Sequence, residues 1–213
     1  MRAFKDLAAT YKEIAKERKN FWDCIVPVSG GKDSHFQVHL TKNILGLNPL
    51  LVTYNHLFNT PLGTRNLRNL VSKLLCDNIR FTSNPDAVRK IFAYMLKKCG
   101  DLTWHYHAGI LTFPLQIAVK FNIPLIIWGE NNYSHLVGTF DPDDMVEFSR
   151  KHRKDFGLRG IEAKEAVGQD GIEWSDIAPF VYPDDADIEA VDVKGVYIPI
   201  MLLGKRRPMP RRW

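Results

Sequence analysis

The chain has 213 residues, of which 45% are hydrophobic and 11% aromatic, so it can bury a full core and is expected to be globular. No apolar run approaches the ~20 residues of a membrane span, and the charged first twenty residues lack a signal-peptide core, so we expect a cytoplasmic protein without membrane association. The net charge of +5 comes from the last nine residues, which leave 24 basic against 24 acidic side chains in the body, so nucleic acid is not an expected partner.

The first half of the chain alternates helices with apolar strands. Apolar residues at helical spacing predict an amphipathic helix over residues 1–19, and the apolar stretch 23–29 predicts the first strand. A helix over residues 33–45 follows and ends at Gly46, which is a typical helix C-terminus. Residues 49–54 then predict a second buried strand.

Two further helices begin with a capping residue followed by proline. These pairs stand at residues 60–61 and 84–85, and the second helix ends at Gly100. Residues 78–82 predict a third strand between them.

One more helix and strand complete the alternation. The helix is expected over residues 108–121, bent or restarted at Pro114, and the strand over residues 124–128. Strands that alternate with helices at this spacing predict an α/β fold: a Rossmann-like parallel sheet with right-handed crossovers and helices on both faces.

Beyond Gly129 the pattern changes. Asp141 and Pro142 predict a helix whose last turn holds the basic run RKHRK, which suits the helix macrodipole and indicates a solvated helix rather than a ligand site. Turn residues dominate residues 157–182, where we expect loops and short helices.

The three cysteines carry no predicted chemistry. Cys24, Cys76 and Cys99 are odd in number, far apart and without a CxxC pair, so they indicate neither a disulfide framework nor a metal clip. No cysteine has the sequence context of a nucleophile, and we expect three reduced thiols.

A polar loop joins the first predicted strand to the next helix. It consists of Ser29, Gly30, Gly31, Lys32, Asp33 and Ser34. The carboxyl end of a parallel strand is where such folds bind ligands, and the helix N-terminus that follows exposes unpaired N–H groups. The glycines allow positive φ and close backbone approach to phosphate oxygens, the serines add hydroxyl donors, the lysine adds a positive charge, and Asp33 can hold Mg²⁺. The loop therefore predicts a cradle for a nucleotide pyrophosphate.

Other glycine motifs do not fit this loop. A Walker loop needs four residues between its first glycine and the Gly-Lys pair, and a dinucleotide fold needs GxGxxG. The alternative to a phosphate site is a tight strand-to-helix turn with an acidic cap.

With this loop the sequence resembles the PP-loop ATP pyrophosphatases, which cleave ATP between its α and β phosphates. The segments SGGKDSHF, GLNPLLVTYNHLFNTPLGTRNLRNL, WHYHAGI and NIPLIIWGEN are similar to the N-acetyl sugar amidotransferases of bacterial surface-polysaccharide (lipopolysaccharide and O-antigen) synthesis. The resemblance implies a fold of the adenine nucleotide alpha hydrolase type and a reaction that uses ATP and Mg²⁺. It also implies conversion of an acetamido group to an acetamidino group on an N-acetylated sugar, with ammonia supplied by a separate glutaminase subunit.

The resemblance also places candidate site residues. Lys32, Asp33 and Glu130 are the expected catalytic residues, and Glu130 is expected to contact metal or substrate, with a helix cap as the alternative. The adenine and ribose are expected at Tyr54 and Asn55, which end the second strand.

The remaining candidates follow the fourth strand and open the helix after Gly100. Gly129 is expected at the α-phosphate and Asn131 at the acceptor. For His105 and His107 a substrate or phosphate role and a purely structural role both remain open.

The resemblance also sets the expected domain organisation. It is an N-terminal helix over residues 1–20, an ATP-binding α/β domain over 21–140, a substrate-side extension of helices and loops over 141–198, and a basic divergent tail over 199–213. A homo-oligomer is an expected assembly.

The sequence departs from the family pattern at three places. Thr103 and Tyr106 stand where cysteines are common, and a cysteine-rich N-terminal segment is missing, which argues against a structural metal. Pro27 lies in what should be the central strand, where it removes a ladder donor and predicts a bulge and weaker ATP binding. After Ile198 the pattern gives way to a basic tail, so the chain is either a divergent short member or the product of a frameshift or early stop in an ancestral gene. We hypothesise the second, which translation of the coding DNA in its other two frames tests.

Two other functions remain open from the sequence. A transfer-RNA-modifying PP-loop enzyme would share the loop but should have a basic body. A chain that binds adenine nucleotide or a partner without turnover would fit Pro27 and the divergent tail.

Overall fold

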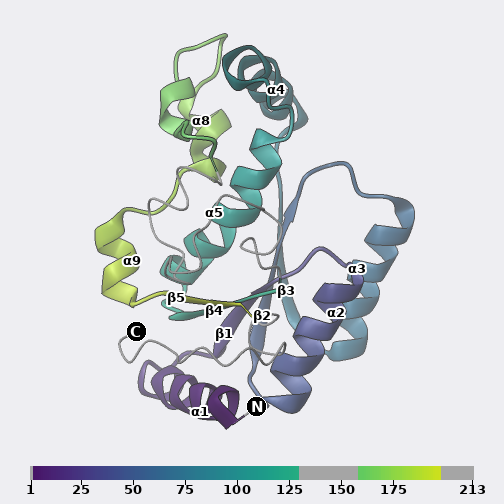
Figure 1. The fold of residues 1–213 in the computed structure, drawn as a ribbon, viewed down its shortest axis with the longest axis vertical. Coiled ribbons are helices and arrows are strands. Elements are labelled where there is room, and N and C mark those ends of the chain that lie inside the picture. The colour runs from purple at the N-terminus through teal and green to yellow at the C-terminus, as the bar shows by residue number, and fades with distance from the viewer. Residues whose placement is uncertain (1, 130–157, 198–213) are drawn as a thin grey trace.

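A five-stranded parallel sheet forms the centre of the molecule (Figure 1). The computed structural model describes residues 2–129 and 158–197. The strand order is β3-β2-β1-β4-β5, so the strand that leads into the polar loop is the central one. The strands are β1 (Cys24–Pro27), β2 (Pro49–Asn55), β3 (Asp77–Thr82), β4 (Leu125–Trp128) and β5 (Lys194–Tyr197).

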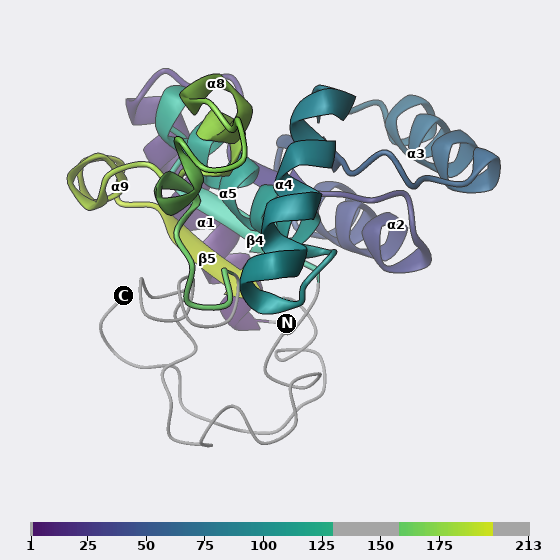
Figure 2. The ribbon, with the colours of Figure 1, turned by 90° about the horizontal axis from the view of Figure 1, so that it is seen from above.

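Helices cover both faces of this sheet (Figure 2). The longer helices are α1 (Arg2–Glu17), α2 (Lys32–His39), α3 (Pro61–Leu74), α4 (Pro85–Cys99) and α5 (Trp104–Lys120). A π-helical turn, η1 (Leu40–Ile44), extends α2. The shorter elements are η3 (Ala163–Ala166), α8 (Trp174–Ile177), η4 (Ala178–Phe180) and α9 (Asp185–Val191).

Alternation along the strands divides the core into two layers. Ile25 faces the layer that contains α4 and α5, whereas its neighbours Cys24 and Val26 face the layer that contains α1, α2 and α3. All three side chains are fully buried, as expected for a central strand covered on both faces. The predicted α/β class with helices on both faces is confirmed.

The predicted helix signals also hold. The Thr60 hydroxyl accepts a hydrogen bond from the Gly63 N–H at 3.0 Å, and α3 begins at the next residue. The Asn84 side chain likewise accepts from the Asp86 N–H at 3.0 Å, and Gly100 ends α4 with a φ of 69°.

The expected bulge at Pro27 is wrong. Cys24 to Pro27 pair residue by residue with Pro49 to Val52, without an inserted residue. The N–H that Pro27 lacks would instead point to the other side of β1. On that side a single residue pair, Ile25 with Ile126, joins β1 to β4.

Two parts of the chain differ from the sequence-based expectation, and a third cannot be compared. The helix expected over residues 108–121 begins earlier, at Trp104, and passes through Pro114 as one α5. The segment after residue 182, which the sequence left without a strand, supplies α9 and β5, and β5 pairs in parallel with β4. The helix expected from Asp141 lies outside the described residues.

Candidate functional site

The loop Ser29–Ser34 leaves the carboxyl end of β1 and is shaped by its own hydroxyl groups. The Ser34 hydroxyl accepts a hydrogen bond from the Ser29 N–H at 3.0 Å and lies 3.3 Å from the Ser29 hydroxyl. The Gly31 N–H points to the Ser29 hydroxyl at 3.4 Å, and the Gly31 carbonyl lies 2.9 Å from the His35 ring. These bonds curl the backbone just before the first turn of α2, where N–H groups have no partner within the helix.

Lys32 and Asp33 occupy this first turn and are exposed. A lysine there adds charge to the positive end of the helix dipole, and the carboxylate beside it is free to bind a cation from the solvent side. Of the two glycines, Gly30 takes the positive φ, 85°, whereas Gly31 is extended and precedes the helix. The loop therefore has the shape and the charges of an anion cradle.

Gly30 also lies directly against α3. A Cβ atom at this position would stand 2.9 Å from both the Gly63 carbonyl oxygen and the Leu67 backbone nitrogen. Both are backbone atoms within α3, so the loop could not keep this position with any larger residue. The cap at Thr60 thus fixes the start of the helix that supports the loop.

The sequence analysis missed Gln37, a residue of α2 that links the loop to β4. Its side chain is 2% exposed, and its Nε2 donates a hydrogen bond to the Ile127 carbonyl. A Cβ atom at Gly129 would stand 2.3 Å from the Gln37 Oε1, so the amide lies tightly against the end of β4. A glutamine in the second turn of a helix carries no sequence signal by itself.

The two candidates at the end of β2 differ in accessibility. Tyr54 is buried, its hydroxyl lies 3.0 Å from the Ser83 hydroxyl, and burial raises its pKa to about 12, a rise that this hydrogen bond partly offsets. Asn55 braces the following turn: its Oδ1 accepts from the Asn59 side chain at 2.6 Å, and its Nδ2 donates to Thr82 at 3.0 Å. Contacts with adenine at position 54 would therefore come from the backbone.

His105 is enclosed by aromatic rings at the start of α5. It is 1% exposed, and its ring centroid lies 4.6 Å from that of Phe92 and 6.2 Å from that of Phe58. Its pKa is lowered from 6.5 to about 4, mainly by burial and to a smaller extent by the nearby rings of His56 and His107. Neither ring nitrogen makes a hydrogen bond. A neutral imidazole is a poor phosphate ligand, so the phosphate role is the weaker of those left open by the sequence.

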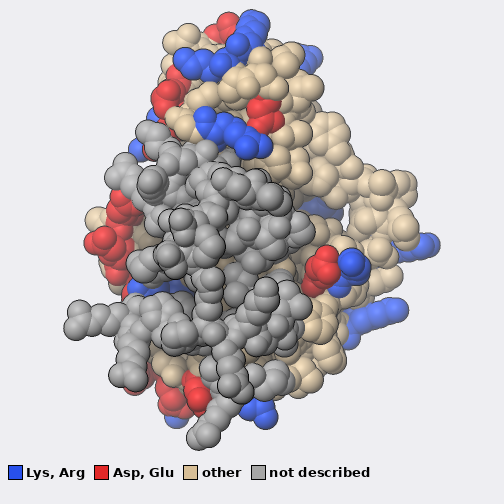
Figure 3. All heavy atoms as spheres, in the orientation of Figure 1, with Lys and Arg blue, Asp and Glu red and all other residues tan. Residues whose placement is uncertain are grey.

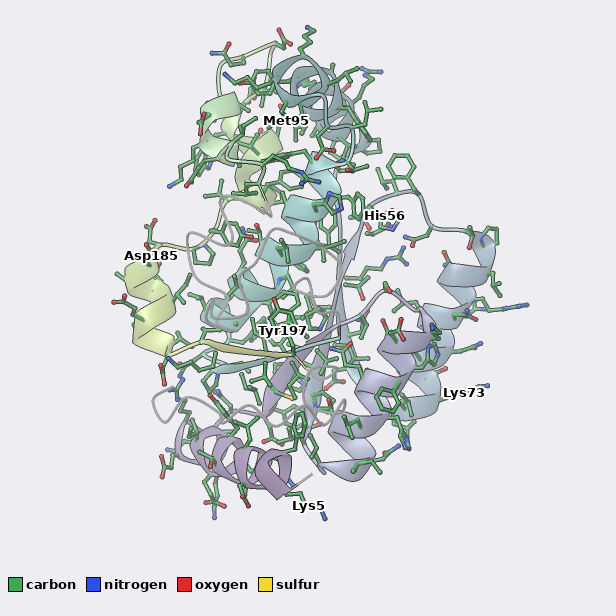
Figure 4. The ribbon with its side chains drawn as sticks, viewed as in Figure 1. Lys5, His56, Lys73, Met95, Asp185 and Tyr197 are labelled. Carbon is green, nitrogen blue, oxygen red and sulfur yellow. The ribbon has the colours of Figure 1, made fainter. Side chains whose placement is uncertain are left out.

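Two other histidines, His56 and His107, lie near His105. His56 stands in the turn after β2, with its ring centroid 5.4 Å from that of Tyr106 (Figure 4). Burial lowers its pKa as well. The His107 ring lies 3.2 Å from the Thr103 hydroxyl, which donates to Asp101 at 2.6 Å.

Charged side chains of both signs lie on the described surface. On the face shown in Figure 3, basic and acidic side chains are interspersed, with acids gathered where α9 begins at Asp185 and Asp187. Within residues 2–129 and 158–197, no helix is long and apolar enough to cross a membrane, and no group of three or more His, Cys, Asp or Glu side chains could hold a metal ion. The candidates Glu130 and Asn131, and the basic tail, lie outside the described residues.

No protein-family model matches the sequence, and no curated protein matches it. Among solved structures, the chain is similar to an NH3-dependent NAD synthetase from Campylobacter jejuni, with 14% identity, 89% of this chain and 90% of that chain covered, and a TM-score of 0.46. It is also similar to an NMN synthetase from Francisella tularensis, with 10% identity, 100% and 98% covered, and a TM-score of 0.43.

A third similar structure is a predicted subunit of tRNA methyltransferase from Methanocaldococcus jannaschii, with 19% identity, 79% and 73% covered, and a TM-score of 0.38. At these identities and TM-scores the similarities carry no functional argument. The function rests on the residues of this chain.

The arrangement defines what the site can do. The loop offers backbone N–H groups, hydroxyls and one lysine to an anion at the end of the central strand, and Asp33 offers one carboxylate to a cation. Magnesium in nucleotide sites takes one or two protein carboxylates and completes its shell with phosphate oxygens and water. The residues therefore fit a magnesium-bound nucleoside triphosphate.

Proposed function

We propose that this chain is an ATP pyrophosphatase-type enzyme that converts the acetamido group of an N-acetylated, nucleotide-linked sugar to an acetamidino group for surface-polysaccharide synthesis. The observation that carries the ATP part is the loop Ser29–Ser34 at the carboxyl end of the central strand, with Ser29, Lys32 and Asp33 exposed and Gly30 at a φ of 85°. The sugar part rests on the resemblance of the segments quoted above.

The reaction has two balanced steps. In the first, the amide oxygen attacks the α-phosphorus of ATP; a P–O bond forms, the bond to the β-phosphate breaks, and pyrophosphate leaves. In the second, ammonia attacks the activated carbon, the C–O bond breaks, and AMP leaves with the former amide oxygen. An amide oxygen is a poor leaving group until it is adenylylated, which is why ATP is consumed.

Each loop residue has a role in this scheme. The backbone N–H groups of the loop, with the hydroxyls of Ser29 and Ser34, would hold the phosphates, and Lys32 would stabilise the charge that develops on leaving pyrophosphate. Asp33 would hold Mg²⁺, which neutralises phosphate charge when bound.

The site of the acceptor sugar is assigned to the carboxyl end of β4 and to the start of α5. Gly129 is assigned to the α-phosphate through its backbone, and Glu130 and Asn131, which follow it in the sequence, are assigned to the acceptor. His105, which is neutral at pH 7 and 1% exposed, would support the wall of the acceptor site from within rather than bind an anion. Ammonia would come from a separate glutaminase subunit, and a homo-oligomer is compatible with this scheme.

The test is release of pyrophosphate and AMP from ATP by the full chain with N-acetyl sugars and an ammonium salt. Asp33→Asn should lower this rate roughly 100-fold, because one preorganised charge is worth about that much. Asp187→Asn, which changes an exposed aspartate in the first turn of α9, is the matched control and should leave the rate unchanged. If the chain binds ATP but releases no pyrophosphate, it is a nucleotide-binding protein and not an enzyme. If it does not bind ATP, the proposal is overturned.

A further inference from the structure

The backbone donor that Pro27 lacks faces β4. The Val28 N–H donates to the Val52 carbonyl of β2 at 2.9 Å. Successive residues of a strand within a parallel sheet direct their backbone groups to opposite neighbours, so position 27 turns toward β4. Pro27 has no N–H to offer there.

The register identifies the carbonyl that loses its partner. β1 and β4 pair at Ile25 and Ile126. Two residues farther along, the N–H of position 27 would donate to the carbonyl of Ile127 in a regular parallel ladder. Ile127 is buried, and a buried carbonyl without a donor is destabilising.

Gln37 supplies that donor. Its Nε2 donates to this same Ile127 carbonyl, and the side chain is buried between α2 and the end of β4. The fit requires glycine at position 129, because a Cβ atom there would overlap the Gln37 Oε1. Pro27, Gln37 and Gly129 are therefore three parts of one arrangement, which we call the amide bridge.

We propose that Gln37 is a positioning residue: its amide replaces the donor missing at Pro27 and thereby holds the Ser29–Ser34 loop against the end of β4. Gln37 stands five residues after Lys32 on α2, the helix that begins at this loop. The bridge thus connects the expected phosphate site to Gly129, the last described residue before Glu130. The replacement of the donor stands on the geometry alone, whereas its effect on nucleotide binding rests on the proposed function.

A double-mutant cycle tests the replacement. Gln37→Met keeps the length of the side chain and removes the donor, so it should lower the Tm by roughly 3–8 °C. In a Pro27→Val background the restored N–H can bond to Ile127, and Gln37→Met should then lower the Tm by less than half as much. The new amide at position 27 should also be protected from hydrogen exchange in the double variant. Additive losses in Tm, or an unprotected amide, would overturn the replacement.

Calorimetric titration with MgATP tests the positioning. Gln37→Met should weaken binding roughly tenfold, because a displaced loop no longer presents its N–H groups together. The matched control is Gln116→Met: the Gln116 amide also donates to backbone carbonyls, of Ala178 at 3.1 Å and Val181 at 2.7 Å, but on the α5 side of the sheet.

The control should lower the Tm and leave MgATP affinity unchanged. Equal MgATP affinities of the two variants would overturn the positioning role. If the wild-type chain does not bind MgATP, the proposed function and the positioning role both fail, while the Tm cycle still decides whether Gln37 replaces the donor at Pro27.

Discussion

His105 shows how a single side chain can make the stability of this protein depend on pH. The ring is buried among Phe58, Phe92 and Tyr106 and makes no hydrogen bond, so protonation would place an uncompensated charge in the core. Its pKa is lowered from 6.5 to about 4, mainly by burial; the rings of His56 and His107 contribute to the lowering, and the charge of Asp101 opposes it. The unfolded chain binds this proton more readily than the folded one between these two values.

The sign of the effect follows from that difference. The contribution of His105 to stability is complete above about pH 6.5 and is lost as the pH falls toward 4, by up to about 3 kcal/mol. We expect urea denaturation at pH 7 and at pH 4.5 to show a smaller loss of unfolding free energy for His105→Phe than for the wild type. Some dependence should remain, because burial also lowers the pKa of His56.

The control for this prediction is His39→Gln, which changes an exposed histidine on α2. Its pH dependence should match that of the wild type. If His105→Phe and the wild type lose the same free energy between the two pH values, His105 does not titrate as its burial indicates.

At the scale of elements, the contact between the polar loop and α3 is a close support of the candidate site. Gly30 combines a φ of 85° with two backbone atoms of α3 at 2.9 Å from the place of a Cβ. Gly100 has a similar φ of 69° but nothing within 4 Å. Comparing Gly30 with Gly100 therefore separates the cost of a positive φ from the cost of the close approach between the loop and α3.

We therefore expect Gly30→Ala and Gly100→Ala to behave differently. Gly100→Ala should lower the free energy of unfolding by about 1 kcal/mol, the cost of a positive φ in alanine. Gly30→Ala should cost more and should also weaken MgATP binding, because the loop must move away from α3. Chemical denaturation and calorimetry measure both quantities, and equal effects of the two substitutions would show that the contact with α3 does not matter.

Most of the elements could be predicted from the sequence because their signals are local. Caps followed by proline locate the starts of α3 and α4, and two apolar runs locate β2 and β4. The place of the polar loop follows from the same logic, since the residues after the first strand of a parallel sheet lie at its carboxyl edge. β5 could not be predicted because it is a four-residue edge strand, and its formation depends on pairing with β4 rather than on its own pattern.

The site could be predicted only in part, because its supports are not local. The burial of Tyr54 depends on the packing of Phe81 and Phe180 around its ring, and Phe180 lies far away in the sequence. The role of Gln37 depends on a carbonyl of β4 and on the proline in β1. A proline in a central strand is itself a usable signal, since the carbonyl opposite it needs another donor.

At the scale of the whole molecule, the sheet separates two core layers that share no side chains. Leu70 of α3 is fully buried in the layer beneath the polar loop, and Ile91 of α4 is fully buried in the opposite layer. The strands connect the layers, since their successive side chains alternate between them. Unfolding of one layer would expose the strand residues of the other.

Such a molecule should unfold as one cooperative unit, and damage to its two layers should add. Leu70→Ala should lower the free energy of unfolding by about 2–5 kcal/mol and Ile91→Val by about 0.5–1.5 kcal/mol. Because these side chains lie on opposite faces of the sheet, the double variant should lose the sum of the two within about 0.5 kcal/mol. Tryptophan fluorescence and far-ultraviolet circular dichroism should follow the same urea transition in each variant. Separate transitions by the two probes would mean that the layers unfold independently. A loss in the double variant that departs clearly from the sum would mean that the two side chains are coupled through the sheet.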